Sequence, residues 1–138
     1  MLINMSWKGN LAFEAETQSW HKILLDAKQE VGGEEKGPRP MEILLVSLAG
    51  CTGMDVASIL KKKRVNLEGM TVKINAEQAP EHPKIFTKIN IEYNFTGKDI
   101  KDEDVKRAIE LSQEKYCPVT AMLEEKAKIT YKWNIINK

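Results

Sequence analysis

The run from Arg39 to Lys63 restricts the fold more than any other stretch, because it is long, apolar and uninterrupted by proline after Pro40. A proline at the first position suits the start of a helix. Apolar residues fall on every side of the predicted helix, which is typical of a helix buried all round: Met41, Ile43, Leu44, Leu45, Val46, Leu48, Ala49, Met54, Val56, Ala57, Ile59 and Leu60. We therefore expect a long, buried central helix.

A membrane span is the competing interpretation of this run. Its apolar part, 41–60, approaches transmembrane length, and the basic residues 61–64 follow it. Glu42 and Asp55 lie inside the run, however, and acidic side chains are costly in lipid. The sequence favours a core helix.

Composition is ordinary for a soluble globular protein. The 138 residues suit one domain, 1–138, and the formal net charge of +1 indicates neither nucleic acid nor an anionic membrane as a partner. The first residues, MLINMSWKGN, lack the basic-then-apolar order of a signal peptide. We expect a cytoplasmic protein whose two cysteines are reduced, and therefore catalytic or inert.

The remaining segments alternate between strand and helix patterns. The order predicts a three-stranded meander, the central helix, a hairpin, two helices and a closing strand: 2–7, 11–16, 20–25, 39–63, 70–77, 85–95, a helix from Asp102, a shorter one after Cys117-Pro118, and 129–135. Asn66 and Gly69 predict a turn before the hairpin, and Thr96-Gly97 predicts its end. Strands and helices segregated in this way indicate an α+β fold.

A second copy of the chain is the expected cover for the central helix. One small sheet can shield only one side of a helix that is apolar all round. We expect a homodimer in which the helices meet through Ser47, Gly50 and Gly53, because small residues let two backbones approach closely.

Cys51 and Cys117 are the candidate chemical groups. A buried cysteine often only fills space, but Asp55 and Ser47 lie one turn from Cys51 on the same face. Cys117 precedes a proline at a predicted helix start, where free N–H groups stabilise a thiolate, so local physics makes it the more acidic thiol. An inert cap residue is the alternative for Cys117. Cys51, in mid-helix, needs a cation brought from elsewhere, and Arg39 is the nearest in sequence.

Two motifs together resemble the OsmC/Ohr family of osmotically inducible and organic hydroperoxide resistance proteins: GPRPMEILLVSLAGCTGMDV and, later, KYCPVTAML. The resemblance implies an intertwined α+β homodimer and a thiol peroxidase that needs no cofactor and reduces organic hydroperoxides. It makes Cys51 the attacking cysteine and Cys117 the resolving one, reversing the ranking drawn from helix ends. It also implies a disulfide between them that an external dithiol reopens, with a lipoyl-type reductant as the candidate.

Two departures indicate a divergent subgroup. The peroxidase branches take a catalytic arginine from the N-terminal strand region, whereas no arginine precedes Arg39 here. They also place a carboxylate directly after the helix-starting proline, where this chain has Met41, with Glu42 one residue later. Arg39 and Glu42 are the candidates to substitute; the alternative is a surface ion pair at a helix start.

These departures keep two further functions open: a binder of small hydrophobic molecules without catalysis, and a redox sensor. The spacing of two histidines, His21 and His82, and two cysteines supports no metal site.

Overall fold

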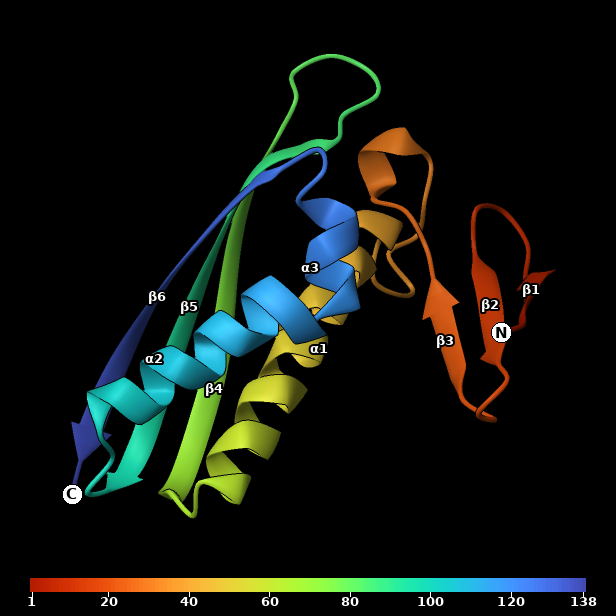
Figure 1. The fold of residues 1–138 in the computed structure, drawn as a ribbon. Helices are drawn as coiled ribbons and strands as arrows, with labels where there is room; N and C mark the ends of the chain where they lie inside the picture. The colour runs from red at the N-terminus through yellow and green to blue at the C-terminus, as the bar shows by residue number, and fades with distance from the viewer. The chain divides into compact units, whose positions relative to one another are not determined.

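The computed structural model describes residues 1–138, which form two compact units, Met1–Val46 and Ser47–Lys138. We call these the N-terminal unit and the C-terminal unit and describe each by itself. The long helix α1 (Pro40–Lys62) begins in the first and continues in the second. Figure 1 shows the elements in chain order. That residues 1–138 act as a single domain stays a prediction.

The N-terminal unit contains the predicted meander. Strands β1 (Ile3–Trp7), β2 (Phe13–Thr17) and β3 (Lys22–Leu25) pair antiparallel in that order. Gly9 and Asn10 form the first turn with positive φ angles of 98° and 50°, a conformation that glycine and asparagine tolerate best. A short 3₁₀ helix, η1 (Gln29–Val31), lies in the connection to α1.

Helix α1 has the predicted extent, but its burial differs from the prediction. In the C-terminal unit its buried residues are Leu48, Thr52, Val56 and Leu60, which repeat every four positions and so form one stripe. Met54, on another face, is 74% exposed. The expectation of a helix buried on every side is therefore wrong for the single chain, because one sheet covers only one face.

Helix α1 is also the one helix that is long and apolar enough to cross a membrane, and 22% of its most apolar 18-residue segment is buried. Core helices of soluble proteins meet the same criteria, so this match is weak evidence.

The C-terminal unit is built on a second sheet of three strands, β4 (Asn66–Gln78), β5 (Phe86–Lys98) and β6 (Lys128–Asn137). Its order is β4-β5-β6, with an antiparallel hairpin followed by a parallel pair. The alternation of β5 buries Ile89, Ile91, Tyr93 and Phe95 on one face, as expected for this strand. At its start the pattern differs, since Phe86 is buried and Thr87 exposed, next to a register irregularity between Glu77 and Gln78.

The hairpin extends further than predicted at its open end, because β4 begins earlier and β5 ends later than expected. Asn66 and Gly69 belong to β4 and Thr96-Gly97 to β5, so the expected turn and strand end are wrong. A register irregularity lies between Leu67 and Gly69, and a Cβ on Gly69 would lie 2.6 Å from Oγ1 of Thr96. The glycine therefore permits a close cross-strand contact rather than a turn.

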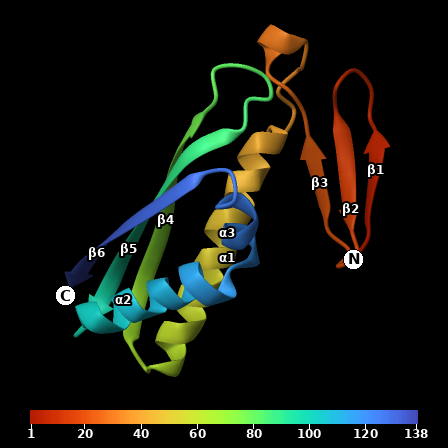
Figure 2. The same cartoon turned by 45° about the horizontal axis from the view of Figure 1, so that its top comes forward.

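Three helical elements follow β5: α2 (Asp102–Leu111), a π-helical turn η2 (Ser112–Tyr116) and α3 (Pro118–Leu123). They lie with α1 on one face of the β4–β6 sheet in both views (Figures 1 and 2). Val105, Ala108, Ile109 and Ser112 are buried, whereas Tyr116 and Met122 are 50% and 78% exposed. The backbone bond from Cys117 N to Ser112 O, 2.8 Å, spans five residues, so the π turn shifts the side chains after it out of register.

Candidate functional site

The fold brings two cysteines from distant parts of the chain together. Cys51 lies in the middle of α1, and Cys117 is the N-cap residue of α3. Their sulfur atoms and a carboxylate oxygen of Asp55 all lie within 4.8 Å of one another. Both thiols are free; Cys117 is buried and Cys51 is half-buried. We call Cys51, Asp55 and Cys117 the thiol–carboxylate cluster.

Both sulfurs lie at the first turn of α3. The N–H of Thr120 donates to Sγ of Cys117 over 3.3 Å, and a hydrogen bond from the backbone of Val119 lowers the pKa of Cys51. The predicted helix start at Cys117 is confirmed. The argument that Cys51 gains nothing from a helix end is wrong, because the N–H comes from a different helix that only the tertiary fold brings near.

Burial outweighs this effect. It is the largest cause, followed by a hydrogen bond with Cys117, of a rise in the pKa of Cys51 from 9.0 to about 11. The charges of Cys117 and Asp55 add to the increase. No cation is among the groups that shift this pKa, so the positive group expected beside Cys51 does not contribute here.

A chain of buried hydroxyl groups ends on Asp55. Ser112 Oγ donates to Asp55 Oδ2 over 2.9 Å, which uses the only proton of that hydroxyl because an ionised carboxylate can only accept. Thr52 must then donate to Ser112, 2.7 Å away, and Tyr93 to Thr52, 2.6 Å away. Gln113 Nε2 donates to both Thr52 and Tyr93 over 3.0 Å. The network thus fixes the position of the Asp55 carboxylate.

Every member of this network has a partner. Thr120 Oγ1 donates to Gln113 Oε1 over 3.4 Å, and no buried side-chain nitrogen or oxygen is unsatisfied. Burial raises the pKa of Tyr93 to about 12, so its hydroxyl stays protonated and can donate at neutral pH. Such complete networks favour one rigid arrangement.

Sequence reasoning missed these supporting residues: Thr52, Tyr93, Ser112 and Gln113. One signal was available. Thr52 and Ser112 are polar residues at positions whose periodic neighbours are buried and apolar, and a buried hydroxyl requires a hydrogen-bond partner.

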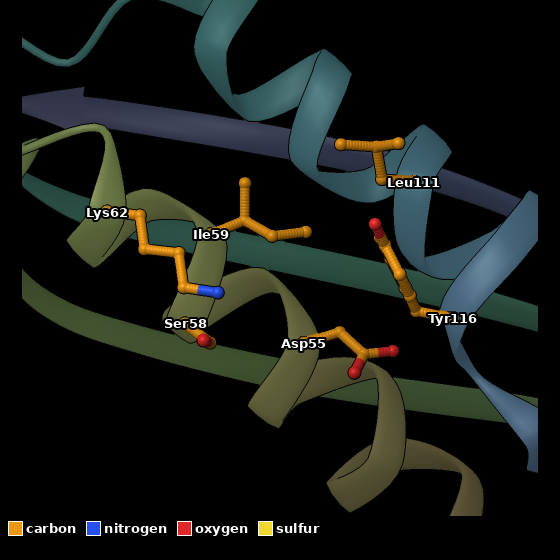
Figure 3. A pocket seen from close by; sticks show the side chains of 6 residues that line it. All are labelled: Asp55, Ser58, Ile59, Lys62, Leu111 and Tyr116. Carbon is orange, nitrogen blue, oxygen red and sulfur yellow. The ribbon is translucent and has the colours of Figure 1, made fainter.

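A pocket of about 430 Å³ adjoins the cluster and shares Asp55 with it. Its other lining residues are Ser58, Ile59, Lys62, Leu111 and Tyr116. In Figure 3 the side chains of α1 face Leu111 and Tyr116 across this space. The pocket therefore combines apolar walls with a carboxylate, a hydroxyl and an ammonium group.

Arg39 and Glu42 lie together in the N-terminal unit. Glu42 Oε1 accepts from the backbone N–H of Arg39 over 2.9 Å and lies 3.9 Å from its Nε. Arg39 Nη2 pairs with Glu35 Oε1 at 2.9 Å. The bond from Glu42 back to Arg39 caps the start of α1. These contacts fit the ion-pair alternative, and catalytic roles for Arg39 and Glu42 stay predictions.

Comparisons with known proteins agree on one fold. A family model described as OsmC-like protein matches residues 33–132. Protein YhfA of Escherichia coli K12 is 40% identical over 136 residues, which cover 99% of this chain and 98% of that protein.

Two solved structures illustrate the range of similarity. A hypothetical protein from Aquifex aeolicus is 31% identical with a TM-score of 0.82, over 99% of this chain and 97% of that one. An organic hydroperoxide resistance protein OsmC from Legionella pneumophila is 16% identical with a TM-score of 0.73, over 96% and 95%, and shows the fold alone. The predicted α+β, OsmC-like fold is confirmed.

Proposed function

The chain belongs to the OsmC-like protein family, and from that premise we propose that it is a thiol-dependent peroxidase that reduces organic hydroperoxides in oxidative-stress defence. The observation that carries the proposal is the approach of the Cys51 and Cys117 sulfurs to within 4.8 Å while both are reduced. Two thiols at this separation need only side-chain rotation and small shifts to join as a disulfide.

In the proposed first step the Cys51 thiolate attacks the outer oxygen of a hydroperoxide, R–OOH. The O–O bond breaks, the sulfur becomes a sulfenic acid, and the leaving alkoxide takes a proton to give the alcohol R–OH. The Val119 N–H at the start of α3 stabilises the thiolate that this step requires.

In the second step the sulfur of Cys117 attacks the sulfenic acid. A Cys51–Cys117 disulfide forms and one water leaves, so the protein carries two electrons fewer than before. An external dithiol, for which a lipoyl group is the candidate, then reduces the disulfide by thiol exchange and is itself oxidised.

The direct test is the intact mass of the reduced protein after one equivalent of cumene hydroperoxide without reductant. We expect the loss of two hydrogens, mapped by peptide analysis to a bond between Cys51 and Cys117. Two unmodified thiols after the pulse would contradict the proposal.

Two single substitutions separate the roles of the cysteines. Cys51→Ser should abolish turnover, because the attacking sulfur is gone. Cys117→Ser should allow one oxidation, seen as the addition of one oxygen, but no Cys51–Cys117 disulfide. If Cys51→Ser keeps wild-type turnover, the mechanism is wrong.

The raised pKa of Cys51 favours a second candidate function. A thiol with a pKa of about 11 is almost entirely protonated at neutral pH and attacks slowly. The same scaffold would then serve as a binder of small hydrophobic molecules, with the pocket beside Asp55 as its site, or as a slow redox sensor. Binding of an apolar ligand without any change in thiol content would favour the binder.

The proposal includes two further elements: a cytoplasmic location and a homodimer. Met54 on α1 and Met122 on α3 are large apolar side chains that are 74% and 78% exposed. A second copy that covers them would lie next to the helices that carry the two thiols.

A further inference from the structure

The thiol–carboxylate cluster contains the donor atoms of a metal site. Two sulfurs and one carboxylate oxygen lie within 4.8 Å of one another. In a tetrahedral zinc site, with Zn–S of about 2.3 Å and Zn–O of about 2.0–2.2 Å, neighbouring donors are separated by about 3.5–3.8 Å. Side-chain rotations that move the donor atoms by about an ångström would close this difference.

The charge balance of the cluster also favours a cation. An ionised Asp55 and thiolates at both Cys51 and Cys117 would place three negative charges in the same small space. The three donor atoms lie within 4.8 Å of one another, so these charges would repel one another strongly without a counter-ion. A divalent cation would compensate two of the three charges and stabilise both thiolates.

The surroundings match those of known metal sites. Ser112, held by Thr52, donates to Asp55 and fixes the carboxylate, and the N–H of Thr120 donates to the sulfur of Cys117. Such outer contacts orient the ligands of a metal ion. Asp55 also lines the 430 Å³ pocket, so its side chain can be reached from that space.

We propose that the reduced protein binds one thiophilic divalent cation, with Zn²⁺ as the type, through Cys51 Sγ, Cys117 Sγ and the Asp55 carboxylate. Binding replaces the two thiol protons by the metal, so two protons leave for each ion bound and no electron is transferred. The inference does not rest on peroxidase activity. It does imply that the metal and a hydroperoxide compete for the same two sulfurs.

Co²⁺ is the probe of choice, because thiolate ligands give it intense near-ultraviolet charge-transfer absorption. We expect the fully reduced protein to bind one equivalent, to release two protons at neutral pH, and to lose the ion to added Zn²⁺. The Cys51–Cys117 disulfide form, prepared with a disulfide-forming oxidant such as diamide, should show none of this absorption.

Variants test the assigned ligands. Since even an outer-shell partner is commonly worth about 10–100-fold in metal affinity, Asp55→Asn should weaken Co²⁺ binding by about 100-fold or more. Asp99→Asn, the same change at an exposed aspartate outside the cluster, should leave the affinity unchanged. Cys51→Ser and Cys117→Ser should each remove about half of the charge-transfer intensity.

Three results would overturn the inference: no Co²⁺ absorption in the reduced wild type, equal affinity of Asp55→Asn and Asp99→Asn, or equal binding by the disulfide form. The hydroperoxide test described above uses metal-free protein and reads the mass of the chain. A failure of the metal site therefore leaves the peroxidase proposal intact, and a failure of hydroperoxide oxidation leaves the metal site intact.

Discussion

At Cys51, burial and hydrogen bonding act on the thiol in opposite directions. The Val119 N–H stabilises the thiolate, whereas the half-buried position and the neighbouring Asp55 destabilise it. Burial is the largest of these effects, so the isolated chain holds Cys51 as a thiol at neutral pH. The reactivity of Cys51 toward a hydroperoxide thus depends on a positive group that would lower its pKa, whereas a bound metal ion would occupy the sulfur.

The pH dependence of oxidation measures this balance. Because the pKa of Cys51 is raised to about 11, the thiolate fraction, and with it the rate of oxidation by cumene hydroperoxide, should rise about tenfold per pH unit from about pH 7 to about pH 10. Stopped-flow or quenched mass measurements on metal-free protein would follow it.

Asp55→Asn provides the control for that profile. The carboxylate raises the pKa of Cys51 by its charge, so removing the charge should move the rise toward lower pH. A rate that is already constant between about pH 6 and pH 8 would contradict the predicted profile, because it would require a thiolate formed well below neutrality.

At the scale of the elements, the π turn η2 connects the two halves of the candidate site. It places Ser112 and Gln113 in the hydroxyl network and, directly after them, Cys117 at the start of α3. Thr52 is the common partner of Tyr93, Ser112 and Gln113, so it joins α1, β5 and η2. The contacts of a single hydroxyl therefore couple the position of Asp55 to that of the second cysteine.

Replacing Thr52 by valine tests how much the hydrogen bonds of its hydroxyl contribute to the stability of the fold. The side chain keeps its shape but removes one hydrogen bond from each of Tyr93, Ser112 and Gln113 and leaves the Tyr93 hydroxyl proton without its acceptor. This should cost about 1–3 kcal/mol in the free energy of unfolding, measured by urea denaturation. Thr71→Val, at an exposed position of β4, should change it by less than about 0.5 kcal/mol. Equal effects of the two substitutions would show that the network contributes little.

At the scale of the whole molecule, α1 is incompletely covered by the single chain. Its C-terminal part buries one stripe on the β4–β6 sheet, while Met54 is exposed. A large exposed apolar side chain beside the candidate site is typical of an interface.

Light scattering or sedimentation should therefore give twice the 15.7 kDa mass of the chain. Met54→Lys should weaken the dimer if this face is buried in it, because a charge would have to be desolvated. Lys73→Met, at an exposed position of β4, exchanges the same two residue types in the other direction and should leave the mass of the particle unchanged. A stable monomer across the concentration range would contradict the proposed dimer.

Much of the fold was predictable because its signals are local. The periodic runs located α1, the meander, the hairpin and the closing strand, and the alternation on β5 identified its buried face. The errors have local causes too: Gly69 serves a strand contact rather than a turn, and the π turn before Cys117 changes which side chains face inward.

The sequence by itself determined the element order and the two candidate cysteines, since periodicity and motif spacing are properties of the chain alone. Only the tertiary structure decided that Asp55 joins the two thiols, that Val119 reaches Cys51 and that Thr52 supports the carboxylate. The pKa of a thiol depends on burial and on charges within a few ångströms. Those neighbours come from α1 and from the start of α3, which lie far apart along the chain and meet only when it folds.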